Sequence, residues 1–217
     1  MPPPIGPAGR PDPERVDREA RIIDGLEGEL GRVARAIHDG PLQELSAVGI
    51  RLQLLRPALT APQQEEIDEM LVALRTASNQ LRTLQFNLRP SSLDSNDIAA
   101  ALTDLTAEHS DAGRVRRLAT APFPAPTPAG ARALFRAAQL LLRAADARRH
   151  DHLDALLAPD PTGVRLTVEI GPGPSGERFA LTEPEVVGLA DRVEAVGGSF
   201  EQDLDDTFTC HLRVPAP

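Results

Sequence analysis

A single histidine with a neighbouring carboxylate is the most informative feature of this 217-residue chain. His38 directly precedes Asp39, and the side-chain amide of Gln43 follows one helical turn beyond the acid. Imidazole is nucleophilic near neutral pH, and an adjacent carboxylate can fix its tautomer and raise its basicity. Such a histidine can carry a phosphoryl group. Arg32 and Arg35 could steady phosphoryl oxygens as bidentate donors, although a charged outer helix face uses arginines in any case.

These residues belong to a long amphipathic helix. Asp12 and Pro13 predict its start, because an acidic cap followed by proline at the first helical position is a common opening. Apolar residues then follow coiled-coil spacing to about Leu59, in two runs: Ile23, Leu26, Leu30, Val33 and Ile37, then Leu45, Val48, Leu52, Leu55 and Leu59.

The spacing slips between these two runs, in the stretch that contains Pro41. Such a slip locally unwinds a supercoil. Proline also cannot bond the carbonyl of Ile37, a defect that costs about 3 kcal/mol inside a helix. The sequence therefore predicts an irregular turn beside His38, which is either a distorted and accessible functional turn or a tolerated kink.

A second helix is predicted from about Gln63 to Leu88, after a turn bracketed by Pro57 and Pro62. Its apolar stripe comprises Ile67, Leu71, Leu74, Leu81, Leu84 and Leu88. Two helices with single apolar seams cannot bury those seams as an isolated hairpin. We therefore expect two chains to pair as a homodimer with a four-helix bundle.

The second half of the chain predicts an α/β sandwich with helices on one face of a mixed sheet. Helices are expected at 96–109 (capped by Asp94 or Ser95), 129–148 and 183–196, the last ending on a glycine pair. Strands are expected at 115–119, 152–158, 163–170, 198–204 and 207–214. The expected organisation is a proline-rich tail at 1–11, a helical hairpin at 12–90 and an α/β domain at 91–217.

Composition excludes several classes of function. The net charge of −9 disfavours non-specific nucleic-acid binding, and lysine, Trp and Tyr are absent. The lone Cys210 rules out an internal disulfide and a cysteine-based zinc cluster, and it fits a buried strand position. No apolar run approaches membrane-spanning length, so the sequence predicts a cytoplasmic protein that does not enter a membrane.

The residues from Arg35 to Gln43 resemble the phosphoacceptor box of sensor histidine kinases, in the subfamily with a His-Asp-x-x-x-Gln pattern. The Leu-Arg-Pro run at 88–90 is similar to the junction at which that subfamily enters its second domain. The order of elements in the second half resembles the family's ATP-binding domain, so the resemblance spans nearly all of 15–215.

The resemblance implies roles for three residues. His38 would be the phosphoacceptor, and Asp39 would polarise its imidazole as a general base. Gln43 would position a water for attack on an aspartyl phosphate. The alternatives are a surface ion pair between Arg35 and Asp39 and ordinary solvation of Gln43.

The residues that bind nucleotide on the central helix of the resembled family are replaced in this chain. The family's box reads roughly Gln-Glu-Ala-Leu-x-Asn-Ala, and the corresponding run here is 139–145. Leu140 stands at the catalytic acid and Ala144 at the metal-binding amide.

The adenine-reading and lid motifs have also changed. Aligned on Gly171 and Gly173, Glu169 could stand in for the adenine-reading aspartate; aligned without a gap, Ile170 replaces it. The lid's Gly-x-Gly-Leu has become a run that begins with Glu183 and includes Glu185, and acids there would repel phosphates. We therefore expect no bound ATP, no cofactor and no resident metal ion.

The expected function is phosphoryl relay without ATP between His38 and the receiver aspartate of a response regulator, with an upstream histidine kinase as a further candidate partner. Known histidine phosphotransferases that resemble degenerate kinases have this plan, with the second domain as a docking wall for the receiver. One alternative is a non-catalytic pseudokinase that sequesters a regulator or a kinase. Another is an active kinase with a divergent ATP site.

Two further clusters could suggest sites. His150 and His152, with Asp151 and Asp154 between and after them, could suggest a metal site, but no third ligand has supporting spacing and surface polarity is the better interpretation. The arginines at 114, 116 and 117 form a small basic patch that we expect to be solvated.

Overall fold

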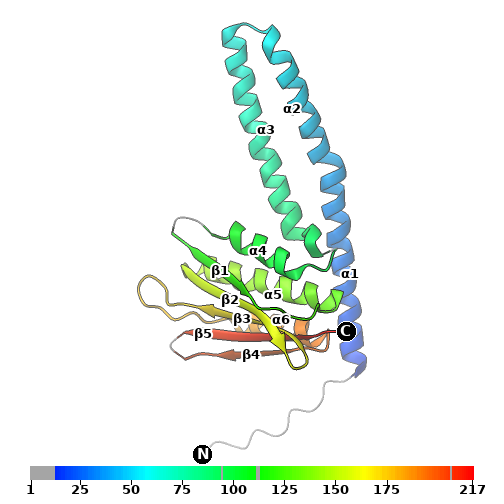
Figure 1. Ribbon diagram of the computed structural model, residues 1–217, viewed down its shortest axis with the longest axis vertical. Helices are drawn as coiled ribbons and strands as arrows, with labels where there is room; N and C mark the ends of the chain where they lie inside the picture. The colour runs from blue at the N-terminus through cyan, green and yellow to red at the C-terminus, as the bar shows by residue number, and fades with distance from the viewer. Residues whose placement is uncertain (1–12, 94, 111–112, 206) are drawn as a thin grey trace, which may run out of the picture. The chain divides into compact units, whose positions relative to one another are not determined.

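The computed structural model describes residues 13–217 except for 94, 111–112 and 206. The chain divides into two compact units, one at Asp24–Ser91 and one that includes Ser92–Pro217. Each unit is described by itself below (Figure 1). The predicted tail at 1–11 and the predicted cap at Asp12 lie outside the described residues.

The first unit is a helical hairpin. Helix α1 (Pro13–Ile37) leads into a π-helical turn (His38–Leu42), which continues directly into α2 (Gln43–Leu55). A short 3₁₀ turn at 56–58 then connects to α3 (Ala61–Leu88). The irregularity that Pro41 predicted is therefore confirmed, and it takes the form of a π turn.

Local capping and one ion pair close the end of the hairpin. Thr60 and Gln63 form a capping box at the start of α3, in which the Gln63 side chain accepts from the Thr60 backbone N–H at 3.1 Å. Arg56 donates two hydrogen bonds to the Asp68 carboxylate, at 2.8 and 2.7 Å. Such bidentate pairs fix geometry as well as adding energy, so this pair helps to set the register of α2 against α3.

Among the described residues of 92–217, the second unit has three α-helices and a five-stranded sheet. In chain order its elements are α4 (Ile98–Glu108), β1 (Val115–Thr120), α5 (Pro128–Ala147), β2 (His152–Asp160), β3 (Gly163–Ile170), α6 (Glu183–Glu194), β4 (Ser199–Asp203) and β5 (Phe208–Pro215). The strand order is β1-β2-β3-β5-β4; β1 and β2 are parallel and the other neighbours are antiparallel.

The helices of this unit cover one face of the sheet, as Figure 1 shows for α4, α5 and α6. Side chains alternate along β3 and β5, so that every second residue is buried against the helix layer. Helix α5 supplies the largest apolar surface, including Leu134, Phe135 and Leu141, all 0% exposed. The predicted helical region followed by an α/β sandwich with a mixed sheet is confirmed.

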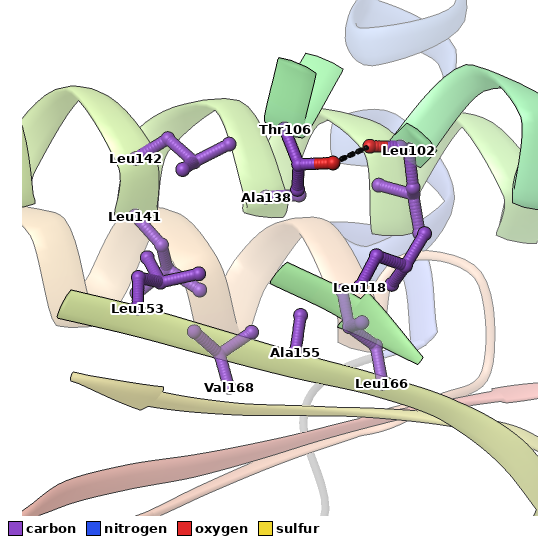
Figure 2. Close-up of a pocket in the computed structure, with 10 residues that line it drawn as sticks. All are labelled: Leu102, Thr106, Leu118, Ala138, Leu141, Leu142, Leu153, Ala155, Leu166 and Val168. Atoms are coloured by element: carbon purple, nitrogen blue, oxygen red, sulfur yellow. Dashed lines mark hydrogen bonds between the residues drawn. The ribbon is translucent and has the colours of Figure 1, made fainter. Parts of the chain in front are cut away.

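A small apolar cavity lies between α4, α5 and the strands β1 to β3 (Figure 2). Its volume is about 10 Å³, and its only polar lining group is the hydroxyl of Thr106. That hydroxyl donates back to the carbonyl of Leu102 at 3.0 Å, so its donor is already used. The cavity is therefore a packing void of the core.

The cap of α4 differs from the prediction. Its N-cap is Asp97, whose carboxylate accepts from the Ala100 N–H at 2.9 Å. Ser95 instead donates to the carbonyl of Ser92, and Asp94 lies outside the described residues. The helix starts later than expected because Asp97 stands at the correct spacing for a cap before the first buried residue, Ile98.

Candidate functional site

The π turn places His38 on the surface of the hairpin. His38 is its first residue and Asp39 its second, and both side chains are exposed, as are those of Arg35 and Gln43. Leu42, at the end of the turn, is buried. π turns within α-helices frequently mark functional sites. The structure thus presents all four predicted site residues to solvent around one irregular turn.

These four side chains are close in sequence but do not bond to one another. Within the described residues, no hydrogen bond or ion pair joins His38, Asp39, Gln43 and Arg35. The alternative surface pair between Arg35 and Asp39 is therefore absent, whereas Arg32 does pair with Glu29 one turn earlier. Contacts of this kind in free enzymes are often loose and tighten only when the partner binds.

A row of large apolar residues is exposed on the hairpin at heptad spacing. On α1 and α2, the first arm of the hairpin, the row comprises Leu26 (60% exposed), Val33 (47%), Val48 (43%) and Leu55 (57%). On α3 it includes Met70 (49%) and Leu84 (48%). We call this set the open seam. Its members lie apart from the buried hairpin interface, which includes Ala34, Leu42, Ile67 and Leu71.

The positions that match the nucleotide box on α5 offer no ligand atoms. Leu140 is half-buried and Ala144 is 5% exposed, and neither carries a side-chain oxygen or nitrogen. Gln139 is buried, and its Oε1 accepts from Arg136 at 2.8 Å. The residues present therefore do not fit a metal–nucleotide site of the resembled type.

The sheet register places the two candidates for the adenine motif, Glu169 and Ile170, on opposite faces of the sheet. On β3, Val168 and Ile170 are buried on the helix side, at 2% and 1% exposure. Glu169 between them is exposed, and it lines a shallow groove on the open face of the sheet with Asp154 and Thr167. Glu169 therefore points away from α5 and Ala144. Ile170 lies on the helix side and is apolar, so neither residue places a carboxylate beside α5.

The neighbourhood of α5's last turn is filled by the chain itself. Phe179 is 3% exposed and meets the rings of His150 and Phe208 edge-on, at centroid distances of 5.2 and 4.9 Å. Arg148, one turn after Ala144, lies 5.4 Å from the Phe179 ring centre.

Arg148 also ties α5 to the start of α6. It donates to the Glu185 carboxylate at 2.6 Å, and the same carboxylate accepts from the N–H and hydroxyl of Thr182 in a capping box. Burial acts to raise the pKa of Glu185, but the hydrogen bonds from Thr182 and Arg148 hold it below its ordinary value. Where the resembled family has a glycine-rich lid, this chain therefore begins a capped helix.

Two predictions about surface polarity are wrong. His150 is 3% exposed and its Nδ1 hydrogen-bonds to the carbonyl of Gly171 at 2.9 Å. Arg116 is 6% exposed; it donates to Asp146 and to the carbonyl of His150, both at 2.7 Å. Each of these residues bonds to a partner that is distant in the sequence. Local sequence patterns do not reveal such pairs.

Asp146 is the centre of a half-buried ionic cluster. Besides Arg116, it accepts from His109 Nδ1 at 2.6 Å and lies 3.5 Å from an Arg114 nitrogen. Burial acts to raise the pKa of Asp146, but the bonds from Arg116 and His109 hold it below its ordinary value. The cluster joins α4, β1 and α5 and is structural in character.

The remaining candidates behave as ordinary residues. Among the described residues no group of three or more His, Cys, Asp or Glu side chains is arranged to hold a metal ion. Cys210 is fully buried, and this burial raises the pKa of its thiol to about 12. In the described part of the chain, no helix is both long enough and apolar enough to cross a membrane.

Sequence reasoning missed Arg148, Phe179 and Thr182. The Thr182-x-x-Glu185 spacing is a capping-box signature that is visible in the sequence. Arg148 and Phe179 left no local signal, because their contacts cross between separate elements.

Comparison with known proteins finds similarity to histidine kinases. Residues 29–93 match the family model HisKA_3, described as Histidine kinase. The chain is 33% identical over 93 residues to sensor histidine kinase NarS of Mycobacterium tuberculosis. This alignment covers 43% of this chain and 21% of NarS. It is 35% identical over 88 residues to sensor histidine kinase MctS of Rhizobium johnstonii, covering 39% and 19%. The chain thus spans about a fifth of the length of these relatives.

Among solved structures, the histidine kinase domain of a blue-light activated histidine kinase from Erythrobacter litoralis aligns with 80% of this chain and 94% of that chain. The TM-score is 0.42 and the identity 10%. Residues 29–93 are thus similar to the histidine kinase family model, and about two fifths of the chain is similar to each of these sensor histidine kinases.

Proposed function

We propose that this chain is a histidine-containing phosphotransfer protein of a two-component system. In this proposal His38 exchanges a phosphoryl group with the receiver aspartate of a response regulator, and ATP takes no part. The observation that carries the proposal is the exposed His38 at a π turn, inside the segment that matches the histidine kinase family model.

The transfer step is a displacement at phosphorus. The unprotonated imidazole nitrogen of His38 attacks the aspartyl phosphate, the N–P bond forms, and the P–O bond to the receiver aspartate breaks. The carboxylate leaves with the electron pair, and the receiver's own Mg²⁺ stabilises the charge that develops. The proton on the other ring nitrogen can pass to Asp39 or to water.

The residues around His38 have distinct roles in this proposal. Asp39 keeps the imidazole nucleophilic, and Arg35 offers a planar donor to phosphoryl oxygens. Gln43 positions a water that would hydrolyse the aspartyl phosphate, so the protein would also act as a phosphatase. Because all four side chains are exposed and unbonded to one another, a docking receiver can recruit each of them.

The open seam supports a homodimer. Large apolar side chains at heptad spacing on both arms of the hairpin are what a four-helix bundle buries. Exposed apolar patches of this kind on a soluble hairpin mark an interface. We propose that a second copy of residues 12–90 covers the seam, with 91–217 as a separate domain.

The second domain supports the absence of ATP chemistry. Leu140 and Ala144 lack the acid and the amide, and Glu169 lies on the opposite face of the sheet. Phe179 and the Arg148–Glu185 pair occupy the surroundings of the last turn of α5. We propose that this domain has kept its fold as a docking wall for the receiver.

The proposal is tested by incubating the dimer with a receiver domain that carries a labelled aspartyl phosphate. We expect acid-labile, alkali-stable label on the chain, absent from His38→Ala and unchanged in His152→Ala, whose histidine is also exposed but lies on β2. Receiver binding without any transfer of label would refute the relay and favour a non-catalytic pseudokinase that sequesters its regulator.

A further inference from the structure

The helix that carries His38 has a buried face in the hairpin interface and an exposed face, the open seam. For both faces to be continuous in a regular α-helix, the helix would need one residue fewer. Ala34 and Leu42 are both buried in the hairpin interface, at 4% and 7% exposure. At about 100° per residue, the eight steps between them would leave Leu42 about 80° from Ala34 in an α-helix. A π turn absorbs one residue, and the remaining seven steps bring the two side chains within about 20° of each other.

The open seam gives the same result independently. Leu26 and Val33 are one heptad apart, and so are Val48 and Leu55. Val33 and Val48 are fifteen residues apart, which is one more than two heptads. The seam is therefore continuous only if one residue between them is absorbed. Both the buried and the exposed apolar faces require the same insertion.

This register argument fixes the number of extra residues but not their place. Any turn between Val33 and Val48 could in principle hold the π geometry. Pro41 removes this freedom, because it has no N–H for the carbonyl of Ile37 and its ring collides with that carbonyl in a regular helix. The turn that contains Pro41 is therefore the least costly place for the insertion, and the structure has it at His38–Leu42.

We propose that Pro41 is a positioning residue that fixes the π turn at His38 and thereby holds the imidazole in one outward orientation. The proposal rests on the proposed function, in that the orientation matters for in-line transfer from a receiver. It adds that the irregular turn is itself part of the transfer machinery, although Pro41 touches no reacting atom.

The test is Pro41→Ala in the full-length dimer. The register still requires an absorbed residue, but the π turn is now free to migrate along the helix. We expect the rate constant of transfer to His38 to fall about tenfold, because a misplaced nucleophile loses in-line geometry. The receiver dissociation constant should stay unchanged, and the melting temperature should not fall. Glu44→Ala, an exposed substitution next to the turn, serves as the matched control.

Amide hydrogen exchange supplies a readout that needs no phosphotransfer. In the wild type, weak protection should be confined to residues 38–42; in Pro41→Ala it should spread into the neighbouring turns. A wild-type transfer rate in Pro41→Ala, or weak protection that stays at 38–42, would overturn the positioning role. If wild-type protein fails to accept phosphate on His38, the relay itself is refuted, and the exchange data still decide whether Pro41 fixes the turn.

Discussion

The hairpin and the α/β unit differ in how far their apolar side chains are buried and in whether their polar side chains are bonded. In the hairpin, large apolar residues of the open seam remain 43–60% exposed, and the side chains of His38, Asp39, Arg35 and Gln43 are exposed without bonds to one another. In the α/β unit, the core residues of α5 are fully buried. Polar groups near the α5 positions that correspond to the resembled nucleotide box bond within the unit: Arg148 bonds Glu185, and Gln139 accepts from Arg136. The hairpin leaves large apolar side chains exposed, whereas the second unit closes its apolar core and bonds these polar groups within itself.

The largest expected effect concerns the open seam. The double substitution Val48→Asp and Leu55→Asp places two charges in the proposed dimer interface. Burying unpaired charges is strongly unfavourable, so we expect the dimer dissociation constant to rise by about a thousandfold or more. Analytical ultracentrifugation over a concentration series measures the change.

Ile50→Asp is the matched control for this experiment. Ile50 lies on the same helix with 58% exposure but about 160° around the axis from Val48. The Ile50→Asp substitution should leave the dimer dissociation constant unchanged. A wild-type dissociation constant in the double variant would remove the argument that the hairpin needs a second copy.

The closed character of the α/β unit predicts a stability effect at Asp146. Asp146→Asn removes the charge opposite the buried Arg116, and such losses cost about 3 kcal/mol. Because the folded pKa of Asp146 is lowered, its stabilisation is complete above the ordinary value of about 3.9 and is lost as the pH falls through the folded pKa. Urea unfolding of wild type and variant should differ fully at pH 7 and converge below about pH 4.

Asp154→Asn provides the comparison for that substitution. Asp154 is exposed on the open face of the sheet and lies directly opposite Glu169. Removing one of two like charges on neighbouring strands should be neutral or slightly stabilising. An equal loss of stability in both variants would contradict the specific role of the Asp146 cluster.

The last prediction is that ATP has no effect on the melting temperature, even after an amide is placed at residue 144. Ala144→Asn returns an amide to the position of the family's metal ligand, but Phe179 and the Arg148–Glu185 pair remain in place. We expect millimolar ATP with Mg²⁺ to leave the melting temperature of both wild type and variant unchanged, since only a ligand that binds the folded state raises it. A concentration-dependent rise in either protein would show that the α/β unit is open to nucleotide.

Local patterns in the sequence predicted most of the architecture. Heptad spacing predicted both arms of the hairpin, Pro41 predicted the irregular turn, and β-strand alternation predicted β3 with its observed bounds at Gly163–Ile170. These features depend on residues that are neighbours along the chain, so a single sequence is enough to reveal them.

Features that depend on distant partners could not be predicted in this way. Arg116 is buried because Asp146 lies thirty residues later on α5, and His150 is buried against Gly171 and Phe179. The faces of the sheet on which Glu169 and Ile170 lie could not be assigned in the same way. Their placement follows from the pairing of β3 with β2 and β5, which the sequence alone left open.

The most direct test compares two phosphate donors on one protein. The full-length chain is incubated either with γ-labelled ATP and Mg²⁺ or with a receiver domain bearing labelled aspartyl phosphate, and the label is mapped by peptide analysis. We predict label on His38 from the receiver and none from ATP. Label on His38 from ATP, or no label from any phosphorylated receiver that binds the chain, would contradict the account.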